Sequence, residues 1–185
     1  MQYPDTSQRL LVRFLEQLYA AVRAPGADPL RDVLDLMRRS GIRAADIADF
    51  YVPVVAHRLG QGWCDDTLDF VQVSLGCARL QSLLQRLDAS WYCPDAGGFG
   101  TGVRLAVIVP RGEQHSLGAH ILTGQLRRAG CAVDLLIDLD DAAIVHHLGV
   151  SAPDATLISA SRWLSLDSLH TLVRNIRGAR GFGRC

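Results

Sequence analysis

The feature that most constrains the fold is a regular alternation, over the second half of the chain, of short apolar runs with segments whose apolar residues recur at helical spacing. The runs predict strands at 103–109, 132–137 and 155–159, and the segments predict helices at 117–129, 140–147 and 166–176. Parallel strands need a crossover connection, so strands that alternate with helices form a parallel sheet. We therefore expect an α/β domain whose strands all point the same way.

The first half of the chain has apolar residues at helical spacing, and helix-start and helix-stop residues mark its boundaries. Asp28 precedes Pro29 at the start of one predicted helix, and Gly41 follows its end. Further helices are expected at 44–59 and 65–87. The last of these opens with three carboxylates that the helix dipole stabilises, Asp65, Asp66 and Asp69. With an amphipathic first helix, these segments predict a four-helix bundle.

A glycine-rich stretch that contains Pro94, YCPDAGGFGTG at 92–102, separates the two patterns. Glycine and proline interrupt helices and strands alike. We expect a helical cap domain at 1–90, a linker at 91–102 and an α/β domain at 103–185.

The composition argues against several classes of protein. Nineteen basic and nineteen acidic residues cancel, so no net charge draws the chain to nucleic acid or to an anionic membrane. The apolar runs are far shorter than a bilayer span and the N-terminus lacks a signal-peptide core, so we expect a cytoplasmic protein. The five cysteines form no C-x-x-C pair and are expected to be mostly buried thiols.

A histidine, His115, lies in the turn that leaves the first predicted strand. Ligands of doubly wound sheets bind beyond the carboxyl ends of the strands, where Ser159 is also expected. Phosphate-binding turns use glycine at such a position, so an imidazole suggests a metal instead. Glu113 could bond one imidazole nitrogen and orient the ring, and Gly118 could let a bulky group approach the backbone.

The pattern Glu113-x-His115-x-x-Gly118 resembles the E/D-x-H-x-x-G motif of the cobalamin (vitamin B12)-binding family. A serine element further along the chain, Ser159-Ala160-Ser161, matches the family's second motif. The resemblance implies a flavodoxin-like (Rossmann-like) domain in which His115 ligates the cobalt and Glu113 orients it. Ser159 and Ser161 would contact the nucleotide tail of the cofactor. The remaining residues of the histidine loop would also bind the cofactor: Gln114, Ser116 and Leu117.

The helical half resembles the bundle that caps the corrin in methionine synthase and in light-sensing regulators, through LGQGWCDDTLDFVQVSLGCARLQSLLQRL at 59–87. The resemblance implies that Trp63 and Phe70 cover the upper face of the macrocycle and that Ser74 contacts it. Light-sensing relatives that use adenosylcobalamin carry Glu-His where this chain has Val73-Ser74, so their light-formed upper ligand is missing here. The segment is more similar to the AerR/PpaA-type antirepressors, a group that includes a haem-binding variant.

The resemblance implies a regulatory function. AerR/PpaA-type proteins sense light or redox state through a tetrapyrrole and bind a repressor of photosystem genes, CrtJ/PpsR, rather than act as enzymes. We therefore expect a tetrapyrrole held between the cap and the α/β domain, with cobalamin as first choice and haem as second. A corrinoid methyl carrier is an alternative, since it shares the cap and the histidine motif, and an interaction module without a ligand is another.

The final segment, RNIRGARGFGRC, departs from the family because it shows neither a fourth strand nor the family's Gly-Gly turn. The α/β domain is therefore expected to be C-terminally incomplete, and its third strand to be an open edge that favours a homodimer. Haem needs only an axial histidine and an apolar cleft, which keeps haem open as an alternative. Among the other histidines, His146 and His147 are expected to lie at a helix end, and His57 could supply a sixth ligand.

Overall fold

The computed structural model of the chain describes residues 6–26, 28–87, 102–160 and 166–179. Ser161 and the predicted linker, apart from Gly102, lie outside these described residues. Within them, no helix has the length and the apolar character that a membrane crossing requires. The chain divides into two compact units, Met1–Trp91 and Tyr92–Cys185.

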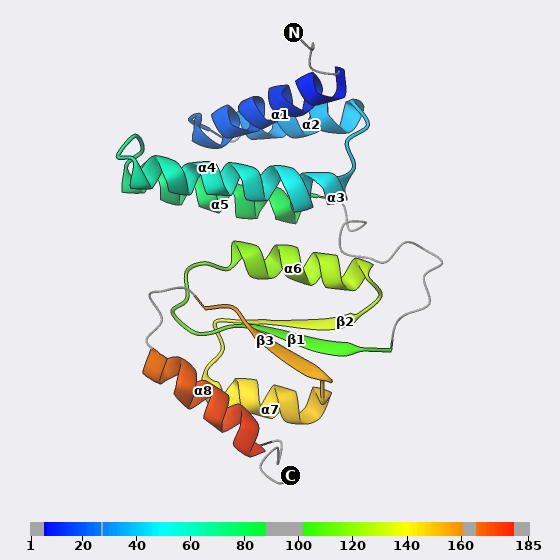
Figure 1. The fold of residues 1–185 in the computed structure, drawn as a ribbon, viewed down its shortest axis with the longest axis vertical. Helices are drawn as coiled ribbons and strands as arrows, with labels where there is room; N and C mark the ends of the chain where they lie inside the picture. The colour runs from blue at the N-terminus through cyan, green and yellow to red at the C-terminus, as the bar shows by residue number, and fades with distance from the viewer. Residues whose placement is uncertain (1–5, 27, 88–101, 161–165, 180–185) are drawn as a thin grey trace. The chain divides into compact units, whose positions relative to one another are not determined.

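The first unit is helical, as the apolar spacing predicts. Its helices are α1 (Thr6–Arg23), α2 (Asp28–Arg39), α3 (Ala44–Asp46), the π-helical η1 (Ile47–Tyr51), α4 (Val52–Cys64) and α5 (Phe70–Arg86) (Figure 1). Helix α1 packs against α2, α4 and α5. Apolar side chains that are almost fully buried form the core between these helices: Phe14, Leu18, Val22, Leu34, Met37, Val55, Leu59, Leu80 and Leu83. Helices α3, η1 and α4 follow one another without a break and form one continuous helical segment. With α1, α2 and α5, this segment makes up the expected four-helix bundle.

The continuous segment from α3 to α4 is longer than the sequence predicts, because it ends at Cys64 rather than near Leu59. Pro53 lies in the first turn of α4, where its missing N–H would leave a gap in a regular α-helical ladder. The π-helical η1 comes directly before it, and such wider turns accommodate interruptions of the ladder. The extension carries Trp63 into the last turn of α4.

The predicted start of the fourth helix is wrong for Asp65 and Asp66. Helix α5 begins after Asp69, whose carboxylate accepts a hydrogen bond of 2.7 Å from the backbone N–H of Gln72. The Gln72 side chain accepts one of 3.0 Å from the Asp69 N–H in return, which completes a capping box. Asp65 and Asp66 form the turn between α4 and α5, and Asp66 has a left-handed backbone with φ 55°.

The second unit has the predicted order of strands and helices. It consists of β1 (Arg104–Val109), α6 (Leu117–Arg128), β2 (Ala132–Ile137), α7 (Asp141–Ser151), β3 (Ala155–Ile158) and α8 (Leu166–Ala179). The sheet has the strand order β2-β1-β3, and both pairings are parallel. This confirms the prediction of an α/β domain with a parallel sheet.

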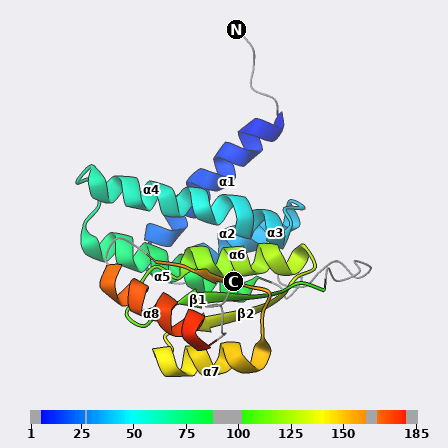
Figure 2. The same cartoon turned by 60° about the horizontal axis from the view of Figure 1, so that its bottom comes forward.

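The central strand β1 is buried on both faces of the sheet. Helix α6 covers one face, and α7 and α8 lie side by side on the other (Figures 1 and 2). Val107 and Val109 pack on the α6 side, whereas Ala106 and Ile108 pack against α7 and α8. Because successive side chains of a strand point to opposite faces, a strand covered on both sides is apolar throughout. The run LAVIV therefore fixes the centre of the sheet.

Helix α7 continues past the predicted end at position 147 to Ser151. Ala152, with a left-handed backbone of φ 42°, ends it. His146 and His147 therefore do not cap the helix end, and this prediction is wrong. His147 instead lies 3.0 Å from Asp134 of β2, measured from Nε2 to Oδ2.

The described cysteines are less buried than the sequence analysis predicts. Cys64 is exposed, and Cys77 and Cys131 are half-buried. Cys64 ends α4 next to the exposed turn that precedes α5, which explains its exposure. Burial raises the pKa of the Cys77 thiol, so this thiol is the less reactive kind.

Candidate functional site

The loop that follows β1 is built by a tight turn. The N–H of Glu113 donates a hydrogen bond of 3.0 Å to the carbonyl of Pro110. Gly112, inside this turn, has φ +82°, a conformation that favours glycine. The turn brings Glu113 back beneath the loop, so that the side chain two residues later lies within its reach.

Glu113 holds His115 by two contacts from a single oxygen. Its Oε1 accepts a hydrogen bond of 2.7 Å from the backbone N–H of His115 and lies 2.8 Å from His115 Nδ1. The Glu113 side chain is only 2% exposed, whereas the imidazole is 65% exposed. A carboxylate accepts and does not donate, so the proton of a neutral imidazole belongs on Nδ1. The Nε2 atom then carries the lone pair, and its part as a metal ligand stays a prediction.

The start of α6 leaves space beside this histidine loop. A Cβ added at Gly118 would meet nothing within 4 Å, so packing inside the protein does not require glycine there. Gln114 is exposed, and Ser116 and Leu117 are half-buried. This exposed first turn can therefore accept a bulky group without a change in the backbone.

Ser159 lies at the same end of the sheet as the histidine loop, where the strands have their carboxyl ends. It follows β3 directly, and its N–H donates a hydrogen bond of 2.8 Å to the carbonyl of Ile108, near the end of β1. Because β1 and β3 are parallel neighbours, their carboxyl ends lie at the same end of the sheet. The structure thus places Glu113, His115 and Ser159 at the carboxyl end of the sheet, where ligands of doubly wound folds bind.

Sequence reasoning missed a contact between the histidine loop and the end of β2. Arg111 Nε lies 4.0 Å from Asp138 Oδ1. Asp138, just after β2, has a left-handed backbone with φ 56°. Since β2 is the other neighbour of β1, the rule that places ligands at strand ends would also have drawn attention to Asp138.

The helical unit presents an exposed aromatic pair. Trp63 is 49% exposed and Phe70 is 68% exposed, and their rings meet edge to face with centroids 6.0 Å apart. Val71 and Leu75 of α5 are also largely exposed, as is Ser74. A group of large apolar side chains on a surface often marks a binding site, whereas single exposed apolar side chains are common. The part of Trp63 and Phe70 as a cover for a cofactor stays a prediction.

The protein groups around His115 do not form a metal site of their own. Among the described residues, no three side chains of His, Cys, Asp or Glu are arranged to hold a metal ion. A single axial histidine suits a metal that already has its other ligands from a macrocycle. The donor set therefore fits a tetrapyrrole better than a bare cation.

Two comparisons relate this architecture to known proteins, and no protein-family model matches the chain. The methanol:cobalamin methyltransferase complex MtaBC from Methanosarcina barkeri has a similar fold, with a TM-score of 0.50 and 14% sequence identity. The match covers 98% of this chain and 66% of that chain, so this protein spans just under two thirds of the length of that neighbour.

A protein from Rhodobacter capsulatus is similar in sequence. It is described as an uncharacterized 20.5 kDa protein in the bchF-crtJ intergenic region, and it is 30% identical over 144 residues. The match covers 78% of this chain and 74% of the relative. The chain belongs to the family of this bchF-crtJ intergenic-region protein.

Proposed function

We propose that this protein is a cytoplasmic regulator that binds cobalamin through His115 and changes the activity of a transcriptional repressor in response to light or redox state. The observation that carries the proposal is the pair formed by His115 and the buried carboxylate of Glu113. A carboxylate that holds one imidazole nitrogen and leaves the other exposed is the usual support of a metal-binding histidine.

The residues at the carboxyl end of the sheet suit the lower side of a corrin. His115 would hold the cobalt through Nε2, and Glu113 would keep the proton on Nδ1 and fix the ring. The open space beside Gly118 would admit the corrin, and Ser159 would contact the tail. Trp63 and Phe70 would supply an apolar cover. When bound, cobalamin supplies a cobalt whose axial ligation depends on oxidation state and light.

The regulatory part of the proposal comes from the relative and from the family resemblance. The relative's description places it between bchF and crtJ, and the segment around Trp63 resembles AerR/PpaA-type antirepressors. A repressor of the CrtJ/PpsR type is the partner that we propose. A ligand can shift such an association only if the two ligand states make different contacts with the partner.

Two alternatives each have one observation in their favour. The likeness in fold to a methanol:cobalamin methyltransferase complex is what a corrinoid methyl carrier would also show. The exposed histidine and the aromatic pair would equally suit a haem sensor, because haem binding requires an axial ligand and an apolar surface.

The test of binding compares wild type with two histidine variants. Each protein is incubated separately with hydroxocobalamin and with hemin and desalted, and its absorption spectrum is recorded. We expect wild type to retain corrin bands and His115→Ala to lose them or change their axial ligation. His146→Ala, a matched change at an exposed position of α7, should behave as wild type. Retention of haem alone would replace cobalamin by haem, and spectra identical for wild type and His115→Ala would exclude His115 as the ligand.

The test of regulation measures the affinity of the loaded protein for an immobilised CrtJ/PpsR-type repressor, in darkness and light and under oxidising and reducing conditions. We expect the affinity to differ between ligand states. Retained cobalamin with no affinity for the repressor, together with methylation of the bound cobalamin by a corrinoid methyltransferase, would favour the carrier.

A further inference from the structure

The outer edge of β3 has backbone groups that point away from the sheet. In the described part of the chain, β3 pairs only with β1. The N–H of Ser159 donates to Ile108 of β1, and alternate residues of a parallel strand bond to the same neighbour. Leu157 therefore also faces β1, whereas the backbone N–H and C=O of Thr156 and Ile158 face outward. Such an edge is a template for another strand.

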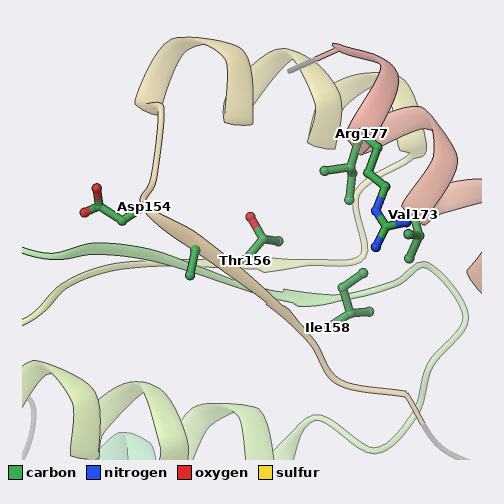
Figure 3. A pocket seen from close by; sticks show the side chains of 7 residues that line it. Asp154, Thr156, Ile158, Val173 and Arg177 are labelled. Atoms are coloured by element: carbon green, nitrogen blue, oxygen red, sulfur yellow. The ribbon is translucent and has the colours of Figure 1, made fainter. Parts of the chain in front are cut away.

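A pocket of about 440 Å³ opens beside this edge, between β3 and α8 (Figure 3). Figure 3 shows Asp154 at one end of the pocket, the Arg177 guanidinium and Val173 at the other end, and Thr156 between them. The remaining lining is mostly apolar, with Ile158 and Ile176. The pocket is thus an apolar trough with an acidic end and a basic end.

Thr156 adds an unsatisfied group to the trough. Its Oγ1 is buried and has no hydrogen-bond partner among the described residues. A buried hydroxyl without a partner is unfavourable, but strand pairing at this edge would use backbone groups and does not depend on the hydroxyl.

We propose that a second copy of this chain occupies this edge, with its β3 antiparallel to the first across a twofold axis at Leu157. Thr156 of one copy then lies opposite Ile158 of the other, and the outward backbone groups form roughly four hydrogen bonds between the copies. The two three-stranded sheets become one continuous sheet. Because the axis is perpendicular to the sheet, α8 of both copies lies on the same face.

The distribution of charge selects a second copy over an unrelated strand. A twofold interface must be complementary to itself. Rotation about Leu157 brings the acidic end of one trough, Asp154, next to the basic end of the other, Arg177. The Asp154 carboxylate, just before β3, accepts a hydrogen bond of 2.8 Å from the Arg104 N–H and lines the same trough as Arg177 of α8. Both charges of each pair therefore lie beside the troughs. The inference does not rest on the proposed function, because it requires no ligand.

The experiment measures the oligomeric state of the full chain, without added ligand, by sedimentation velocity over a range of concentrations. We expect a dimer for wild type. Thr156→Pro removes an outward N–H and should therefore give a monomer. Its fold should be retained, because edge strands tolerate proline where the N–H faces outward. Thr156→Val is the matched control: it keeps the N–H and the shape of the side chain, and it should remain a dimer.

The charge pairs are tested separately. Arg177→Glu, on the exposed side of α8, places like charges together at two symmetric positions and should weaken dimerisation by about tenfold. Combining it with Asp154→Lys reverses both charges and should restore much of the affinity. A wild type that is monomeric at every concentration would overturn the proposal. So would a dimer whose dissociation constant is the same for Arg177→Glu as for wild type, and this variant decides the matter if circular dichroism shows that Thr156→Pro is unfolded.

Discussion

Replacement of Glu113 by glutamine isolates the contribution of its charge to the His115 site. Glu113→Gln keeps the size of the side chain and an oxygen at the same place, but it removes the negative charge. In wild type, one oxygen of the buried carboxylate accepts from the His115 N–H at 2.7 Å and contacts Nδ1 at 2.8 Å. Both contacts survive in the variant as bonds to a neutral acceptor.

The expected loss follows from the number and type of these bonds. A hydrogen bond to a charged group contributes about 1.5–3 kcal/mol and a neutral one about 0.5–1.5 kcal/mol. Two such bonds therefore lose about 2–3 kcal/mol in total. If that stabilisation is used to hold His115 as a ligand, the affinity for cobalamin should fall by roughly 30- to 150-fold. The loss is smaller than for His115→Ala, because the imidazole is still present.

Equilibrium dialysis of hydroxocobalamin measures this affinity, and thermal unfolding shows whether the fold survives. The matched control is Glu16→Gln on α1, where the glutamate is 55% exposed and pairs with Arg58 at 2.8 Å. The control should bind cobalamin as wild type does. Equal affinities and equal absorption spectra for Glu113→Gln and wild type would refute the idea that the Glu113 charge orients the ligand.

Three further predictions concern stability. Arg79→Met should lower the free energy of unfolding by about 1.5–3 kcal/mol in urea titrations, because Arg79 of α5 donates to two backbone carbonyls at the end of α1; Arg39→Met, exposed at the end of α2, should change it little. Thr123→Val should raise the unfolding free energy by about 1 kcal/mol, because the buried Thr123 hydroxyl has no partner among the described residues; a loss of stability would contradict this. Burial lowers the pKa of His120 below its ordinary value, so the unfolded chain binds the proton more readily. The His120 contribution should be complete above about pH 6.5 and should fade as the pH drops through the lowered pKa; His120→Gln should flatten this part of the stability profile, and an unchanged profile would exclude His120 as its source.

The sheet could be predicted closely from the sequence because its strands are buried apolar runs. The predicted range 132–137 is the observed β2, and β1 and β3 differ from prediction by one residue at one end. The end of α7 could not be predicted in the same way. Many helices end at a glycine in a left-handed conformation, but α7 passes Gly149 and ends at Ala152. Only the three-dimensional contacts of the chain settle such an end.

The junction of α4 and α5 shows how a local signal can be misread. Three nearby aspartates, Asp65, Asp66 and Asp69, could each start α5, and the sequence analysis predicts the start at the first of them. The spacing of Asp69 and Gln72 fits a capping box, and attention to that pattern would have placed the start correctly. The structure instead places Trp63 in α4 rather than in a loop, and Phe70 at the first position of α5. The correction therefore concerns both residues of the exposed aromatic pair.

The candidate site was predictable to the extent that it is local. Glu113 and His115 are two residues apart, so a hydrogen bond between them follows from a single turn of the chain. The contact of Arg111 with Asp138 depends on which strands are neighbours, which the sequence does not state. The burial of the Glu113 carboxylate beside an exposed imidazole also emerges only from the packed fold.

The measurement that tests the central claim most directly is electron paramagnetic resonance of the protein loaded with cobalamin in its Co(II) form. A nitrogen axial ligand splits each cobalt line, and protein in which only histidine carries ¹⁵N distinguishes histidine from the cofactor's own base. We expect the splitting to change from triplets to doublets on labelling, and to revert to triplets or disappear in His115→Ala. Triplets that persist in labelled wild type would show that no histidine binds the cobalt and would contradict the proposed role of His115.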